Sequence, residues 1–277
     1  EEDLSVIKDH LAGTMTADIS EQVSESPAVD LSEAEKISPQ NFRITEDDPD
    51  LGGPKGKFQA NIQAIQTLQT LETENRPATP EEQIILSHYS GWGGLSKAFD
   101  PDSPEWSKEY GQLKSLLTPQ EYEAARASTL NAFYTPPAVI RSMYQVLSNI
   151  GFSTGNVLEP SCGTGNFFGC LPEGMDNSRL YGIELYSLTG RIAQKLYPKA
   201  QIQIDGFERT SFPNDFFDVV IGNVPFGNYQ VPDRRYDRYK FPIHDYFIAK
   251  SLDQVRPGGL VAVVTSSGTL DKENPAA

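Results

Sequence analysis

The sequence predicts an α/β protein, with a parallel sheet covered by helices on both faces. Short apolar runs of strand length alternate with helical segments in the second half of the chain, an order typical of such sheets. A glycine turn follows the first run and leads into another helix. We expect three regions, namely an acidic linker at 1–56, a small helical region at 57–130 and the sheet domain at 131–277.

The first region is strongly acidic. Its 56 residues hold 14 of the chain's 38 acidic residues and 4 of its 23 basic ones. With few aromatic residues and no sustained periodicity, it cannot bury enough apolar area to offset the entropy of ordering. We expect it to be mostly disordered, with acidic mimicry of DNA as the alternative. The net charge of −15 says little about the partners of residues 57–277, because most of the excess negative charge lies in residues 1–56.

Composition narrows the class of protein. Two cysteines, Cys162 and Cys170, and three scattered histidines argue against a metal site or a disulfide framework. No apolar run approaches the ~20 residues of a membrane span, and no signal-peptide pattern is present. We therefore expect a cytoplasmic protein with reduced thiols. The chain starts at Glu1 and ends soon after a strand-like run, so we interpret it as a piece of a longer protein.

The helical region has clear start signals. Apolar residues recur at helical spacing from Phe58 to Leu71, which predicts a helix ending near residue 75. Thr79 and Thr118 are each followed by Pro and, three residues on, by Glu, a pattern typical of helix N-termini. Between these starts, Ser-Gly-Trp-Gly-Gly-Leu breaks the pattern at 90–95. We expect its tryptophan to anchor the core, with a contact loop as the alternative.

The sheet domain is predicted element by element from its apolar pattern. A loop at 131–137 leads to a helix whose apolar residues share one face and which ends at Gly151. Strands are expected at 156–159, 180–184, 201–204, 217–222 and 260–265, and helices near 166–170, 187–197 and 245–255. Because ligands bind at the carboxyl ends of parallel strands, the residues that follow each strand are the candidate site.

The first candidate is the turn after the first strand, Glu-Pro-Ser-Cys-Gly-Thr-Gly at 159–165. Gly163 and Gly165 let the backbone approach a ligand, and the N–H groups of the next helical turn point toward it. A purely structural turn is the alternative.

Two acids follow the next two strands. Glu184 suits the two hydroxyls of a ribose, because a carboxylate accepts from both, although capping the next helix is the alternative. Asp205 precedes Gly206 and Phe207, where an acceptor and a ring could hold an adenine, with an ordinary Asp-Gly turn as the alternative.

The fourth strand ends in Asn223-Val224-Pro225-Phe226. These residues suit methylation of a planar amino group such as N6 of adenine. Its nitrogen is a poor nucleophile because the lone pair is delocalised into the ring, and two acceptors aimed at its N–H groups help it pyramidalise. The Asn223 side chain and a backbone carbonyl at Val224 or Pro225 can serve. Phe226 offers a face on which an extruded base can stack. A strand-ending turn with a core phenylalanine is the alternative.

A basic, tyrosine-containing segment follows at 231–240. Basic side chains interleaved with aromatic rings are typical of nucleic-acid contacts, and a solvated loop is the alternative. The candidate DNA-binding residues are Arg234, Arg235, Tyr236, Arg238 and Lys240.

Three segments, Asn131–Pro136, the glycine turn at 159–165 and Asn223–Phe226, resemble motifs in the catalytic domain of S-adenosylmethionine-dependent adenine-N6 DNA methyltransferases of the gamma motif order. Val224 replaces the first proline of the family's Asn-Pro-Pro-Tyr/Phe motif. The resemblance implies a Rossmann-like sheet, S-adenosylmethionine as cofactor and methyl transfer to N6 of adenine in DNA, with Asn223, Pro225 and Phe226 as catalytic residues. It implies cofactor contacts by Phe133 and Thr135 at the methionine end, and by Glu159, Pro160, Cys162, Gly163, Gly165, Glu184, Asp205 and Phe207.

The segments 90–95, 131–134 and 222–227 also resemble a narrower group, the methyltransferase portions of large helicase-plus-methylase proteins of phages and conjugative elements. This resemblance implies a helicase and a target-recognition part beyond residue 277. The family completes its sheet with two further strands, so we expect the fifth strand to be an exposed or partner-covered edge. Two other functions stay open: methylation of a protein glutamine amide, and an inactive cofactor-binding module that positions a helicase on DNA.

Overall fold

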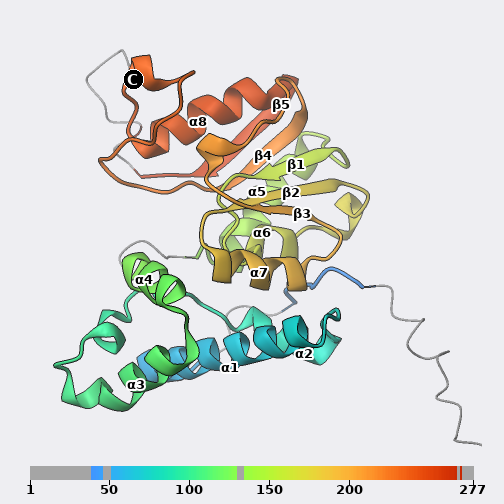
Figure 1. Ribbon diagram of the computed structural model, residues 1–277. Coiled ribbons are helices and arrows are strands. Elements are labelled where there is room, and N and C mark those ends of the chain that lie inside the picture. Colours follow the sequence, from blue (N-terminus) through green and yellow to red (C-terminus); the bar gives the residue numbers. More distant parts are fainter. Residues whose placement is uncertain (1–38, 46–50, 130–133, 267–268, 270–277) are drawn as a thin grey trace, which may run out of the picture. The chain divides into compact units, whose positions relative to one another are not determined.

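Five strands form one parallel sheet in the computed structural model, which describes residues 39–45, 51–129, 134–266 and 269 (Figure 1). The strand order β3-β2-β1-β4-β5 reverses direction between β1 and β4, which places the ligand crevice of such folds at their carboxyl ends. The predicted α/β class, with a Rossmann-like parallel sheet, is confirmed. The strands are β1 Asn156–Glu159, β2 Arg179–Glu184, β3 Gln201–Ile204, β4 Phe217–Asn223 and β5 Val255–Val264.

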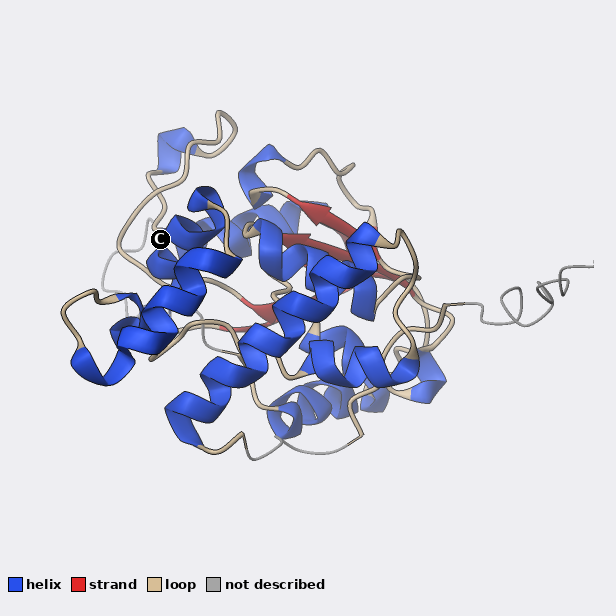
Figure 2. Cartoon of the chain, turned by 60° about the horizontal axis from the view of Figure 1, so that its bottom comes forward, coloured by secondary structure: helices blue, strands red, loops and turns tan. Residues whose placement is uncertain are grey.

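Neighbouring residues of each strand point to opposite faces of the sheet and enter different cores. Val157 and Val219 join one apolar cluster, whereas Leu158 and Val220 join the other. Among the helices that follow residue 130, three bury apolar side chains in the first cluster: α5 (Pro137–Asn149), α6 (Asn166–Gly169) and α7 (Ser187–Leu196). The second cluster lies under α8 (Ile243–Gln254), so helices cover both faces, and Figure 2 shows helices in front of the strands.

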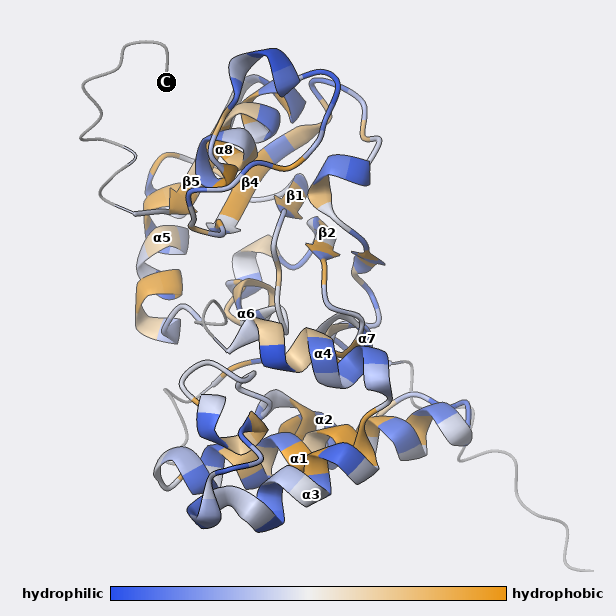
Figure 3. Ribbon diagram, turned by 60° about the vertical axis from the view of Figure 1, so that its left-hand side comes forward, coloured by the Kyte–Doolittle hydropathy of each residue, from blue (hydrophilic) through white to orange (hydrophobic). Residues whose placement is uncertain are grey.

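The helices that precede the sheet follow the predicted start signals. Thr79 and Thr118 both form complete capping boxes, with each side chain accepting from the backbone N–H three residues on. The longest helix alternates hydrophobic and hydrophilic stretches (Figure 3) and buries the face that carries Phe58 and Leu71. A third helix, α3, was not predicted because it buries a single apolar side chain, Leu113. The helices are α1 Gly53–Thr73, α2 Pro80–Ser87, α3 Ser107–Leu116 and α4 Pro119–Ser128, with single 3-10 turns at Ser96–Phe99 and Pro104–Trp106.

This helical region shares the first apolar cluster with the sheet. Trp92 is 2% exposed and packs edge-to-face on Phe99 with ring centroids 5.4 Å apart, which confirms it as a core anchor. Arg191 of α7 forms ion pairs with Glu72 of α1 and Glu121 of α4. The apolar core is therefore continuous across the domain boundary predicted at residue 130.

The acidic region needs one correction. Residues 39–45 lie against the domain: the N–H of Phe42 donates to the carbonyl of Leu196 at 2.8 Å, and that of Ile44 to Gly169 at 2.9 Å. Helix α1 also begins at Gly53, before the predicted limit of 56. The disorder expected for 1–56 is thus wrong for these residues, and 1–38 and 46–50 lie outside the described chain.

Strand β5 begins earlier than predicted. Val255 pairs with Phe217, and an irregularity in the register follows before Leu260 pairs with Val219. Residues 256–259, which lie between the predicted helix and the predicted strand, are therefore inside β5, where Gly258 adopts a φ of 79°. Within the described residues β5 is an edge strand that pairs with β4 alone. Over the same residues, no helix is long and apolar enough to cross a membrane.

Candidate active site

A cavity of about 480 Å³ opens where the carboxyl ends of the strands meet. That volume lies in the range of small-molecule sites. Eleven of the thirteen residues predicted for the cofactor and for catalysis line it: Thr135, Glu159, Pro160, Cys162, Gly163, Glu184, Asp205, Phe207, Asn223, Pro225 and Phe226. Phe133 lies outside the described residues.

The glycine turn is shaped by bonds within the protein. Gly163 lines the cavity at a φ of 56°, and a Cβ there would stand 2.8 Å from the ring of Tyr134. Gly165, the thirteenth residue, does not line the cavity, because its close neighbour is the buried ring of Tyr197, 2.5 Å from an ideal Cβ. A side chain at this position would clash with that ring, and the cofactor contact expected of Gly165 stays a prediction. Helix α6 spans only four residues, so we do not assign it an anion-binding N-terminus.

Glu184 is held in place at the end of β2. Its two carboxylate oxygens accept backbone N–H groups from Gly163 at 2.9 Å and Tyr186 at 2.8 Å. Burial raises the pKa of this carboxyl to about 7, against the lowering effect of those hydrogen bonds. The side chain is oriented by both the glycine turn and the start of α7, and each oxygen keeps acceptor capacity for a hydroxyl.

Two buried polar atoms of the cavity have no hydrogen-bond partner among the described residues. They are the hydroxyl of Thr135 and the Oε2 oxygen of Glu159, whose side chains are 8% and 2% exposed. Burial, and then the neighbouring charge of Glu184, raise the pKa of Glu159 well above its ordinary value. Buried polar groups are normally paired, so both atoms indicate a polar ligand.

The segment after β3 is more self-contained than predicted. The Oδ1 oxygen of Asp205 accepts the N–H of Gly206 at 2.8 Å and also bonds the guanidinium of Arg209. The hydrogen bond from Arg209 lowers the pKa of Asp205. The Asp-Gly turn that was the alternative is therefore present, although Asp205 still faces the cavity. Glu208, which we did not predict, lines the cavity as well.

The segment after β4 is fixed from two sides. The N–H of Val224 donates to the carbonyl of Val264 at 3.1 Å, and the Val224 side chain is buried. The hydroxyl of Ser161, in the glycine turn, donates to the backbone carbonyl of Asn223 at 2.6 Å. Ser161 was missed because nothing in the sequence shows that these two loops meet. Phe226, by contrast, is 42% exposed at the cavity mouth.

The basic segment at 231–240 is folded against α8. Tyr236 is 6% exposed and donates to Asp253 at 2.7 Å, so its ring is not available for base stacking and we withdraw that assignment. Arg235 pairs with the same Asp253 at 3.1 Å, and Arg238 lies over the ring of Tyr239. Arg234, Arg238 and Lys240 are exposed, and none of the predicted DNA-binding residues lines the cavity.

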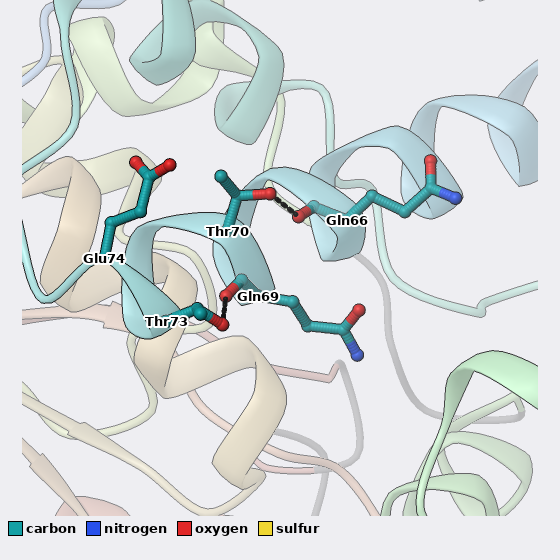
Figure 4. A pocket seen from close by; sticks show the side chains of 5 residues that line it. All are labelled: Gln66, Gln69, Thr70, Thr73 and Glu74. Carbon is teal, nitrogen blue, oxygen red and sulfur yellow. Dashed lines mark hydrogen bonds between the residues drawn. The ribbon is translucent and has the colours of Figure 1, made fainter.

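A second hollow, of about 460 Å³, lies along the exposed side of α1 (Figure 4). The hydroxyls of Thr70 and Thr73 donate to carbonyls of their own helix, at 3.1 and 2.8 Å. This hollow along α1 offers no buried polar group and no apolar wall to a ligand. Among the described residues no cluster of three metal-ligating side chains occurs.

A parallel sheet with a glycine turn after β1, an acid at the end of β2 and Asn-x-Pro-Phe at the end of β4 is typical of the class of S-adenosylmethionine-dependent methyltransferases. The sequence profile described as N-6 DNA methylase matches residues 117–277. The chain therefore belongs to the N-6 DNA methylase family, and S-adenosylmethionine, the cofactor predicted from the sequence, is confirmed as that of the family.

Individual relatives agree with this family. The chain is 30% identical over 221 residues to the defense against restriction protein B of Escherichia phage P1, covering 78% of this chain and 8% of that protein. It is 32% identical over 94 residues to the type II methyltransferase M.CvrRI of Paramecium bursaria Chlorella virus XZ-6E, covering 34% of this chain and 24% of that enzyme. The modification methylase CviBIII of virus NC1A is 24% identical over 148 residues, covering 51% and 39%. The chain thus spans well under half of each relative.

Proposed function

We propose that this chain transfers a methyl group from S-adenosylmethionine to the N6 amino group of adenine in DNA, as one part of a larger protein. The observation that carries the proposal is the shared cavity. The cofactor residues after β1 and β2 and the Asn223–Phe226 segment line the same space. Membership of the N-6 DNA methylase family supports it.

The chain's own residues fit the cofactor. We propose that Glu184 accepts from the two ribose hydroxyls and that Phe207 and Asp205 border the adenine, because all three residues line the cavity. The unpartnered Glu159 oxygen and Thr135 hydroxyl suit a ligand that carries an ammonium and a carboxylate group. When bound, S-adenosylmethionine supplies a methyl group on a sulfonium, which is already activated for direct transfer.

The remaining chemistry concerns the target amine. Asn223 and the neighbouring backbone carbonyl accept its two N–H groups, which shifts the nitrogen lone pair out of conjugation with the ring. The Val224–Val264 and Ser161–Asn223 hydrogen bonds hold this backbone in place before substrate arrives. Phe226, exposed at the mouth, stacks on a base that has left the duplex.

DNA as the substrate, and a helicase elsewhere in the polypeptide, rest on the sequence resemblance. The exposed Arg234, Arg238 and Lys240 are the cations we propose for phosphate contacts. A glutamine amide presents a similar planar nitrogen and is the second candidate substrate. An inactive module that only binds the cofactor is the third possibility, and the Asn-x-Pro-Phe segment beside the cofactor cavity argues against it.

The test is transfer of labelled methyl from S-adenosylmethionine to mixed-sequence DNA, followed by nucleoside digestion. We expect the label in N6-methyladenine and at least about 100-fold slower labelling after Asn223→Ala. Label in protein hydrolysate as N-methylglutamine, with none in DNA, would replace adenine by a glutamine amide. Binding of S-adenosylmethionine without transfer to either substrate, in this chain and in a longer one, would support the inactive module.

A further inference from the structure

The cofactor cavity has a wall that the sheet domain does not supply. Tyr89 and Gly91, around the end of α2, and Ser128, at the end of α4, line it together with Glu184 and Gly163. All three belong to the helical region, which the family resemblance leaves without a function. Gly91 belongs to the Ser-Gly-Trp-Gly-Gly-Leu segment at 90–95.

This segment is held in one conformation by a buried amide. Asn61, on the buried side of α1, has no exposed surface, and its Oδ1 oxygen accepts the N–H of Ser90 at 2.9 Å. Its Nδ2 group donates to the carbonyl of Gly91 at 2.6 Å. A buried amide is costly unless it is hydrogen-bonded, and here both ends of the amide are used on two consecutive residues of the segment.

The backbone and the tryptophan reinforce that conformation. Gly91 adopts a φ of 68°, a left-handed value that favours glycine. The next residue, Trp92, is buried among Phe58, Tyr89 and Phe99. On the far side, the N–H of Gly94 donates to the carbonyl of Thr129 at 3.3 Å, which ties the segment to the end of α4. Gly91 is thus presented to the cavity by a rigid support.

We propose that residues 89–91, positioned by Asn61, form a cofactor-binding wall, so that the helical region is part of the S-adenosylmethionine site. The proposal rests on the function proposed above and adds a binding element to it. A glycine suits this position because its bare backbone lets the cofactor pass close to the wall.

The experiment compares two glycines of the same segment. Gly91 lines the cavity, whereas Gly94, at a φ of 74°, does not and has open space around its Cβ position. Gly91→Ala and Gly94→Ala impose a similar backbone penalty, so their melting temperatures should fall by similar amounts. We expect calorimetry with S-adenosylhomocysteine to give a Kd about tenfold or more higher for Gly91→Ala and about unchanged for Gly94→Ala. Equal Kd values for the two variants would overturn the proposal.

A second pair keeps the test decisive if Gly91→Ala does not fold. Asn61→Ala removes the amide that holds the segment, and Gln83→Ala removes another buried amide, which donates to the carbonyls of Gln40 and Leu196. We expect weaker S-adenosylhomocysteine binding in the first variant only, and equal affinities would contradict the proposal. If the wild-type chain itself failed to bind S-adenosylhomocysteine, the proposed function would fall instead.

Discussion

The half of the cavity that we propose for the cofactor and the half that we propose for the substrate differ in how far they are formed before any ligand binds. On the cofactor side, Glu159 and Glu184 are 2% and 7% exposed, and backbone N–H groups orient Glu184. On the substrate side, Phe226 and Tyr229 are 42% and 46% exposed. The cofactor half is a preorganised pocket, whereas the substrate half has a fixed backbone with open side chains. This difference suits a small cofactor that is enclosed by the protein and a large substrate whose own surface covers the exposed side chains when it binds.

The largest effect is expected at the substrate half. Asn223→Ala removes an acceptor that acts on the amine near the transition state, so we expect kcat to fall by about 10²–10³-fold. The Kd for S-adenosylhomocysteine should stay the same, because the cofactor half keeps its bonds. Asn228→Ala, in the exposed loop nearby, is the matched control. A loss of cofactor affinity in Asn223→Ala that equals the loss of kcat would show that the two halves are not separable.

The next largest effect is expected for the exposed aromatic side chain of Phe226. Phe226→Ala should weaken binding of a single-stranded adenine-containing oligonucleotide by ~1–3 kcal/mol, about 5- to 150-fold in Kd. Leu252→Ala, an apolar residue of α8 that is 59% exposed, controls for loss of exposed apolar surface. Fluorescence anisotropy would measure both variants. No difference between them would mean that Phe226 does not stack on the base.

The cofactor half should respond to pH through Glu184. Ribose hydroxyls donate best to its ionised form, and the pKa of the carboxyl is raised by burial to about 7. Cofactor affinity should therefore rise with pH, and the Kd for S-adenosylhomocysteine at pH 6 should be about tenfold higher than at pH 8. Glu184→Gln should remove this dependence, as calorimetry at the two pH values would show. A pH-dependent Kd in the variant would assign the titration to another group.

The raised pKa of Glu184 also predicts how the stability of the folded protein changes with pH. Because the folded pKa of about 7 exceeds the ordinary value of 4.5, the folded state binds more protons than the unfolded state between these values. The contribution of Glu184 to stability is therefore present below pH 4.5 and is lost as pH rises through 7. Without cofactor, the melting temperature of the wild type should therefore fall more between pH 5 and pH 8 than that of Glu184→Gln, which has no carboxyl to ionise, and calorimetry at the two pH values would show this.

The smallest effect concerns the link between the halves. Ser161→Ala deletes the hydroxyl that donates to the carbonyl of Asn223, and a neutral hydrogen bond is worth ~0.5–1.5 kcal/mol. We expect kcat to fall by about two- to twelvefold with little change in cofactor Kd. Ser178→Ala, whose hydroxyl has no partner among the described residues, is the control. An unchanged kcat in Ser161→Ala would mean that the β4 loop needs no support from the glycine turn.

Local patterns predicted much of the fold and most of the predicted site residues that line the cavity. The capping signals at Thr79 and Thr118 and the strand at 156–159 were confirmed, because caps and apolar periodicity act over a few neighbouring residues. The short turn after β1 placed Gly163 at the cavity for the same reason. The edge position of β5 agrees with a sheet that ends at that strand within the described residues.

Where contacts between distant residues decide the outcome, the sequence was insufficient. The sequence did not show that Gly165 packs on Tyr197, and Tyr236 was assigned to DNA, but it lies under α8. Neither partner could be inferred from neighbouring residues, since both contacts span turns and elements whose arrangement depends on packing.

The sequence by itself determined the order of strands and helices along the sheet domain, the residues that follow each strand and the family to which they belong. Those properties depend on local backbone preference and on the alternation of apolar residues. Only the tertiary structure decided that Ser161 supports Asn223 and that Asn61 presents Gly91 to the cofactor cavity. These hydrogen bonds join residues 62 and 30 positions apart, so they depend on how distant elements pack and not on local backbone preference.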